Sequence, residues 1–195
     1  RLKAGGIDPD QTAADIFPNT TVLVLKFTDT LSLAGRITGT ESITTVDQMV
    51  SHLEDLVAAQ GIDYMKVMGE KIVCAAGFES GIEDHASLIA DLALGIQNHC
   101  SGLFASLNKA MEFRVGIDTG AVLGSSVGRK AKTYNIWGES VRFASKMADS
   151  GIAGGIQVSE ATYRRLRAHY LFKLRGRYYL PNIGEISTYL LTGRI

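Results

Sequence analysis

The run TVLVLKF at residues 21–27 restricts the possible folds of this chain more than any other segment. It is apolar, short and rich in β-branched residues, which is typical of a strand buried inside a sheet. Asp29 follows directly at the end of this run, where a side chain can face a ligand instead of the core. A chain of 195 residues with 46% hydrophobic content can bury such a strand within one globular domain.

Strand-like and helix-like segments alternate along the rest of the chain. Two strand-like runs at 64–68 and 71–76 are separated only by Gly69 and Glu70, the spacing of a tight hairpin with Glu70 at its tip. Helical spacing of apolar residues marks the segments 44–60, 84–107, 140–148 and 160–169. Strand-like runs occupy 113–118, 122–127 and 134–137 and alternate within 170–191. Gly120 permits a sharp change of direction between two of these runs. We expect an α/β (α+β) fold with a mixed, largely antiparallel sheet covered by helices.

Charge and hydropathy exclude several classes of partner. Twenty Lys and Arg residues balance twenty Asp and Glu residues, so no excess charge attracts nucleic acid or a membrane surface. No apolar run approaches the ~20 residues that span a bilayer, and the first residues lack a signal-peptide pattern. Cys74 and Cys100 lack the spacing to Cys or His partners that zinc binding needs, and they indicate buried thiols in a reducing compartment. We expect a cytoplasmic domain over 21–195, with 1–20 as a connector from an upstream region.

Four segments together resemble the catalytic domain of class III adenylate and guanylate cyclases. They are VLVLKFTDT at 22–30, YMKVMGEKI at 64–72, FRVGIDTGAVLGSSVG at 113–128 and YNIWGESVRFASKM at 134–147. The last segment is the most specific, because it is similar to the family block Tyr-Asp-(Ile/Val)-Trp-Gly-x-x-Val-Asn-x-Ala-Ser-Arg-Met. The resemblance covers nearly the whole chain and implies a ferredoxin-like core with added strands. It also implies head-to-tail pairing of two domains, so that a lone copy forms a homodimer with two equivalent sites.

The resemblance implies conversion of ATP to 3′,5′-cyclic AMP and pyrophosphate in cyclic-nucleotide signalling, with two Mg²⁺ or Mn²⁺ ions at each site. Asp29 matches the first metal-binding aspartate of the family, and Glu70 stands in the place of the second. Glu70 keeps the negative charge, but its extra methylene changes the reach of the carboxylate toward Mg²⁺. From the residues alone, Asp29 is equally a loop-capping aspartate and Glu70 a solvated turn carboxylate.

Lys66 and Asn135 match the two positions that bind the base in adenylate cyclases. Lys66 would donate a hydrogen bond to a ring nitrogen, which disfavours guanine because its ring nitrogen is protonated. Asn135 replaces an aspartate, and its amide can either accept or, when flipped, donate, which weakens discrimination. We therefore expect ATP rather than GTP as the ligand. The alternative for Lys66 is an edge-strand lysine that discourages aggregation.

Arg142 and Lys146 match the asparagine and arginine that stabilise the transition state across the dimer interface. Lys146 keeps the positive charge but lacks the planar fork of arginine. Arg142 places a cation where the family has a neutral amide, and it could bind phosphate, pair with Glu70 across the interface, or be a solvated helix residue. A phosphate-binding lysine of the family aligns with Pro181. Two functions remain open: an active adenylate cyclase, and a degenerate cyclase homology domain that dimerises and binds nucleotide without chemistry.

Overall fold

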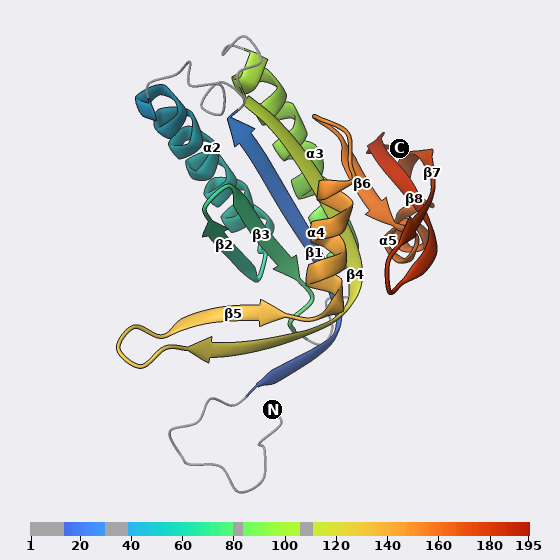
Figure 1. The fold of residues 1–195 in the computed structure, drawn as a ribbon, viewed down its shortest axis with the longest axis horizontal. Coiled ribbons are helices and arrows are strands. Elements are labelled where there is room, and N and C mark those ends of the chain that lie inside the picture. Colours follow the sequence, from blue (N-terminus) through green and yellow to red (C-terminus); the bar gives the residue numbers. More distant parts are fainter. Residues whose placement is uncertain (1–13, 30–38, 80–83, 106–110) are drawn as a thin grey trace, which may run out of the picture.

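The computed structural model describes residues 14–29, 39–79, 84–105 and 111–195. Within these ranges, an eight-stranded sheet is combined with four helices (Figure 1). The elements in chain order are β1 (Asp15–Asp29), α2 (Gly39–Gln60), β2 (Tyr64–Met68), β3 (Lys71–Ala76), α3 (His85–Ala105), β4 (Met111–Val127), β5 (Thr133–Trp137), α4 (Glu139–Asp149), β6 (Ile156–Ser159), α5 (Glu160–Leu166), β7 (Tyr170–Leu180) and β8 (Gly184–Arg194). None of the described helices is both long and apolar enough to cross a membrane.

The elements from β1 to β4 form the expected ferredoxin-like core. Its strands lie in the order β2-β3-β1-β4, and each neighbouring pair is antiparallel. Beyond β4, strand β6 pairs in parallel, and β8 and β7 extend the sheet in antiparallel fashion. Strand β5 pairs with the second half of β4, and the two form an arm that projects from the sheet (Figure 1). The sheet is therefore mixed and largely antiparallel, as predicted.

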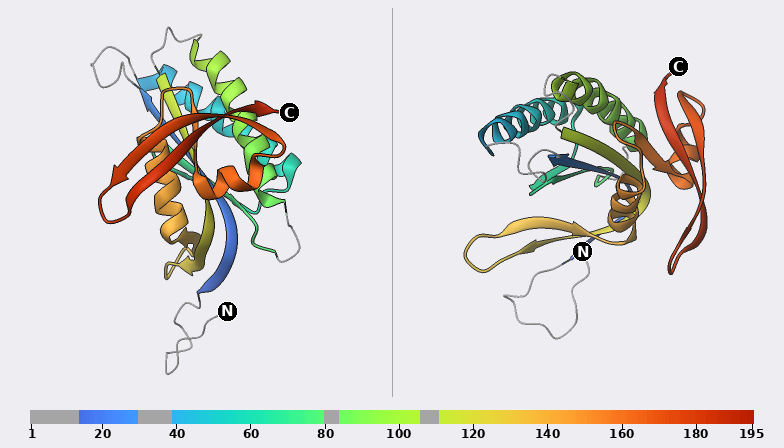
Figure 2. Two further views of the ribbon diagram at one scale, coloured as in Figure 1. Left: turned by 90° about the vertical axis from the view of Figure 1, so that its right-hand side faces the viewer. Right: turned by 45° about the horizontal axis from the view of Figure 1, so that its top comes forward.

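Strand β1 is buried on both faces because helices cover both sides of the sheet around it. Leu23 and Leu25 belong to one apolar cluster, which also contains residues of α2 and α3. Val22 and Val24 belong to a second cluster, which contains Ala144 and other residues of α4. Alternate side chains of a strand point to opposite faces, so this one run supplies both cores. Figure 2 shows α2 and α3 on one side of the sheet and the β4–β5 arm on the other.

Two strands differ from their predicted bounds. Strand β1 begins at Asp15 instead of residue 21, and a bulge between Phe17 and Thr20 accommodates Pro18 in the ladder. The proposed boundary between a connector and the domain stays a prediction. Strand β4 runs without a break from Met111 to Val127, so the two separate strands expected on either side of Gly120 were wrong. Pairing with β1 continues through Gly120, and β4 bends without ending (Figure 1).

Candidate functional site

Lys66 and Asn135, the two predicted base-binding residues, contact each other. Lys66 lies on β2 and Asn135 on β5, two strands that are not neighbours in the sheet. Lys66 Nζ donates a hydrogen bond to Asn135 Oδ1, and both side chains are half-buried. The hydroxyl of Tyr64 also donates to the carbonyl oxygen of Tyr134 at 3.4 Å, one residue from Asn135. The fold thus joins a donor and an acceptor that lie 69 residues apart in the sequence.

Glu70, a predicted metal ligand, lies beside the end of β1. Gly69 has a φ of 61°, which L residues rarely adopt, and so allows the tight β2–β3 turn. The carbonyl oxygen of Glu70 then accepts a hydrogen bond from Phe27 N at 3.0 Å. Phe27 stands two residues before Asp29 on β1, whereas the side chain of Asp29 lies outside the described part. The backbone of Glu70 therefore lies beside β1 two residues before Asp29, and Mg²⁺ is often held in proteins by one or two carboxylates and substrate phosphates.

The described residues contain no further group of metal ligands at this place. No cluster of three or more His, Cys, Asp or Glu side chains occurs among them. Cys74 and Cys100 are buried free thiols, as expected. Burial raises the pKa of both thiols to about 12, which disfavours the thiolate form that binds metal.

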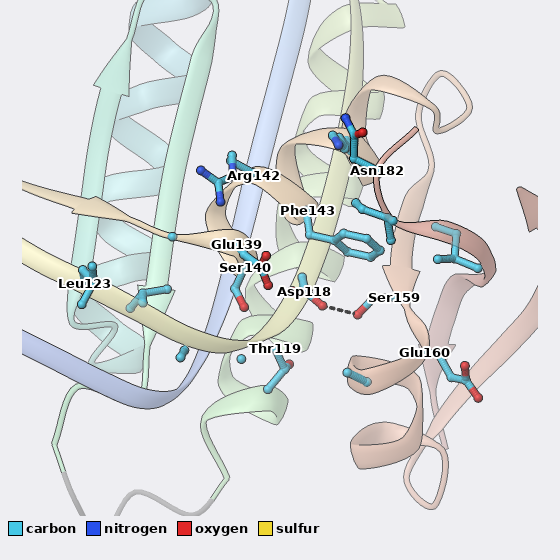
Figure 3. A pocket seen from close by; sticks show the side chains of 18 of the residues that line it. Asp118, Thr119, Leu123, Glu139, Ser140, Arg142, Phe143, Ser159, Glu160 and Asn182 are labelled. Carbon is cyan, nitrogen blue, oxygen red and sulfur yellow. Dashed lines mark hydrogen bonds between the residues drawn. The ribbon is translucent and has the colours of Figure 1, made fainter. Parts of the chain in front are cut away.

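Arg142 and Lys146 project from α4 and border a cavity of about 990 Å³. The cavity lies between α4, the middle of β4, the start of α5 and the β7–β8 turn. Phe143 points into this cavity, whereas Arg142 leaves α4 in a different direction (Figure 3). Neither Arg142 nor Lys146 forms an ion pair with another described residue. Pro181 begins the β7–β8 turn, and the next two residues line the cavity.

Helix α4 is held close to the sheet at both of its ends. Gly116 and Gly120 of β4 face α4, and a Cβ at Gly116 would overlap the backbone of Ala144 and Ala148. At this C-terminal end of α4, Lys26 Nζ of β1 also pairs with Asp149 Oδ1 at 2.5 Å, whereas Gly120 lies against Ser140 at the start of the helix. The missing side chains in β4 therefore set how deeply α4 sits, and so where its two cations lie.

Asp118 is a residue of the cavity wall that sequence reasoning missed. It lies in the middle of β4, with 8% of its surface exposed, and accepts a hydrogen bond from Ser159 Oγ at 2.6 Å (Figure 3). Burial raises the pKa of this carboxyl, whereas hydrogen bonds from Ser159, Ser140 and the Thr119 backbone oppose the shift. The available sequence signal is the aspartate at the end of the strand-like run 113–118, which by itself indicates no more than the end of a strand.

Comparison with known proteins identifies relatives along nearly the whole chain. The sequence model of the adenylate and guanylate cyclase catalytic domain matches residues 13–193. An adenylate cyclase of Mycobacterium tuberculosis is 29% identical over 184 residues, which is 93% of this chain and 41% of that protein. The human guanylate cyclase soluble subunit beta-2 is 28% identical over 187 residues, 93% of this chain and 30% of that protein. This chain therefore spans about two fifths or less of the length of these relatives.

Solved structures support the same fold. The guanylate cyclase domain from Catenaria anguillulae in complex with GTP superposes with a TM-score of 0.84 at 20% identity, covering 93% of this chain and all of that domain. An adenylyl cyclase from P. aeruginosa gives a TM-score of 0.80 at 17% identity, covering 93% and 96%. At these identities the likeness concerns the fold, and the sequence match supplies the family. The chain belongs to the adenylate and guanylate cyclase catalytic domain family.

Proposed function

We propose that this chain converts ATP to 3′,5′-cyclic AMP and pyrophosphate at sites that two identical chains build together. The contact between Lys66 Nζ and Asn135 Oδ1 carries this proposal. Lysine has three donors, so two stay available for a ring nitrogen, and the Asn135 carbonyl has a second lone pair for an exocyclic amine. This pattern complements adenine, whereas the protonated ring nitrogen of guanine would face a donor. The pair therefore supports ATP over GTP.

Divalent cations are the second part of the proposal. Asp29 and Glu70 would hold Mg²⁺ or Mn²⁺, because the Glu70 backbone is tied to β1 two residues before Asp29. When bound, two such ions would polarise the α-phosphate and neutralise charge on the leaving pyrophosphate. Glu70 is exposed, so rotation of its side chain can compensate for the methylene by which it exceeds aspartate.

Arg142 and Lys146 would contact the phosphates and the ribose. Both are cations without an ion-pair partner among the described residues, and both border one cavity. Glu70, Lys66 and Asn135 do not line that cavity. A single chain therefore leaves the predicted residues in separate places, which supports completion of each site by a second copy through two-fold symmetry.

The test combines a product assay with complementation between variants. Purified protein would be incubated with ATP or GTP and Mg²⁺ or Mn²⁺, and cyclic product quantified by mass spectrometry. We expect Glu70→Ala and Lys146→Ala each to abolish product, because each removes one half of both sites. An equal mixture should recover roughly a quarter of the wild-type activity, since half of the dimers then carry one intact site of two.

Matched substitutions of exposed residues serve as controls. Glu79→Ala removes an exposed carboxylate after β3, and Lys173→Ala removes an exposed cation on β7, so both should keep wild-type activity. Activity in the single variants that equals the controls would contradict the assigned residues. Binding of ATP by a folded dimer without any product would overturn the catalytic proposal in favour of the degenerate domain.

A further inference from the structure

A chain of buried polar side chains crosses the core and ends at Asp118. Its members come from five elements, and each is at most 9% exposed. They are, in order of contact, His85, Thr21, Thr119, Thr162, Ser159 and Asp118. The consecutive contacts measure 2.7 Å from His85 Nδ1 to Thr21 Oγ1, then 3.1, 3.0 and 3.2 Å between hydroxyls, and 2.6 Å from Ser159 Oγ to Asp118 Oδ1. None of these contacts has a role in the proposed reaction.

The carboxylate end determines the direction of every hydrogen bond in this chain. A carboxylate only accepts, so Ser159 must donate its single proton to Asp118. Ser159 then has to accept from Thr162, and by the same count Thr162 accepts from Thr119, and Thr119 from Thr21. Thr21 has no proton left for His85. His85 must therefore donate from Nδ1 and leave Nε2 bare.

The opposite end of the chain requires the same direction. Arg165 Nη1 lies 3.4 Å from His85 Nε2, and a guanidinium nitrogen can only donate. Reversal of the chain would put a proton on Nε2 and set two donors against each other. Two independent ends, a guanidinium and a carboxylate, thus demand one proton arrangement.

We propose that these six side chains, together with Arg165, form one polarised hydrogen-bond chain. This chain makes Asp118 a positioning residue for α4. Asp118 accepts from Ser140 in the first turn of α4 and from Ser159, which caps α5. It therefore fixes the start of the helix that carries Arg142 and Lys146. The role of Asp118 in positioning Arg142 and Lys146 rests on the proposed function, whereas the hydrogen-bond chain itself does not.

The charged surroundings of both ends agree with this arrangement. Burial and the adjacent Arg165 lower the pKa of His85, against the opposing effects of Asp84 and Asp63, which favours the neutral ring that the hydrogen-bond chain requires. At the other end, the charged residues that line the cavity with Asp118 are Glu139, Arg142, Lys146, Glu160 and Glu185. The two cations and the start of α4 favour a carboxylate there, whereas the three glutamates oppose it.

The decisive measurement is the tautomer of His85 by ¹⁵N NMR of histidine-labelled protein at neutral pH, with the signal assigned through His85→Gln. We expect a neutral ring protonated at Nδ1. A ring protonated at Nε2, or an imidazolium, would contradict the proposed direction of the hydrogen-bond chain. Thr119→Val removes the middle hydroxyl, so Thr21 becomes free to donate to His85. Arg165 alone then opposes a proton on Nε2, and a fraction of the Nε2–H form should appear. Thr20→Val is the matched control, because the neighbouring buried Thr20 Oγ1 has no partner among the described residues, and it should leave the tautomer unchanged.

A second measurement tests the positioning role separately. Asp118→Asn keeps the shape of the side chain. We expect kcat to fall roughly 10²-fold with KM for ATP unchanged, because a small displacement of α4 would move the groups that contact the transition state. Burial raises the pKa of Asp118 because it disfavours the charged carboxylate, so a neutral side chain of the same shape should not lower thermal stability at neutral pH. Wild-type kcat, or a lowered melting temperature that explains the loss, would contradict the positioning role. If the wild-type protein lacks cyclase activity, the proposed function fails, and the tautomer of His85 still tests the proposed hydrogen-bond chain.

Discussion

At the scale of single residues, Asn135 determines how sharply the base is selected. Its amide meets Lys66 Nζ through Oδ1, but rotation by half a turn would present a donor. Asn135→Asp removes that freedom and gives Lys66 a charged partner. The exocyclic amine of adenine would then donate to a charged acceptor instead of a neutral one. Such a hydrogen bond is worth ~1 kcal/mol more, so the ratio of activity with ATP to that with GTP should rise about fivefold. Comparison of kcat/KM for both nucleotides measures this, and a ratio that falls would contradict the assigned role.

His99 is a second residue with a measurable consequence. Its ring stacks on that of His52 with centroids 3.8 Å apart, which joins α3 to α2, and its Nε2 is buried without a partner among the described residues. Burial, followed by the charge of His52, lowers the pKa of His99 from 6.5. The folded state therefore binds fewer protons than the unfolded state below that pH, and stability is lost as the pH falls. His99→Leu should reduce the fall of the urea-unfolding midpoint between neutral and mildly acidic pH, and a slope equal to that of the wild type would contradict this role of His99.

At the scale of elements, the contact between α4 and β4 depends on a missing side chain. Gly116→Ala would push a methyl group into the backbone of α4, which cannot give way as a flexible side chain would. Overpacking of this kind costs ~1–3 kcal/mol of unfolding free energy, and displacement of α4 should reduce cyclase activity further. Gly102→Ala in α3 is the control, because nothing lies within 4 Å of the added methyl, and it should stabilise the helix by ~0.5–1 kcal/mol. Denaturant unfolding of both variants distinguishes them, and equal stability would contradict this packing argument.

The elements also show what sequence reasoning can reach. Local patterns predicted the buried strand at 21–27, the hairpin around Glu70 and helix α4, because each depends on residues close together in the chain. The start of β1 at Asp15 and the unbroken β4 depend on cross-strand pairing, which has no local signature. Lys66 and Asn135 were found through the family resemblance, since spacing alone left Lys66 an ordinary edge lysine. The role of Asp118 depends on partners up to 41 residues away, such as Ser159, so no motif could reveal it.

At the scale of the whole molecule, self-association is the remaining condition for activity. The β4–β5 arm and the neighbouring β2 expose several large apolar side chains, namely Leu123, Val127, Trp137, Val67 and Met68. Apolar groups that a monomer leaves exposed together are typical of a surface that another chain covers. Since one chain does not gather the predicted site residues into one cavity, we expect activity per chain to rise with protein concentration until the dimer is saturated.

Trp137→Ala tests whether the arm supplies that contact. Trp137 is 44% exposed, and an interfacial tryptophan commonly contributes about 2 kcal/mol, so its loss should raise the dimer Kd roughly 30-fold. Activity of the variant should therefore be low in dilute solution and approach wild type when the protein is concentrated, in step with the dimer fraction measured by sedimentation. Tyr179→Ala on the edge strand β7, where the residue is 76% exposed, should leave the activity and the dimer fraction unchanged. A variant whose activity stays low while it is fully dimeric would instead place Trp137 in the nucleotide site, and activity independent of concentration in a monomer would refute the shared site.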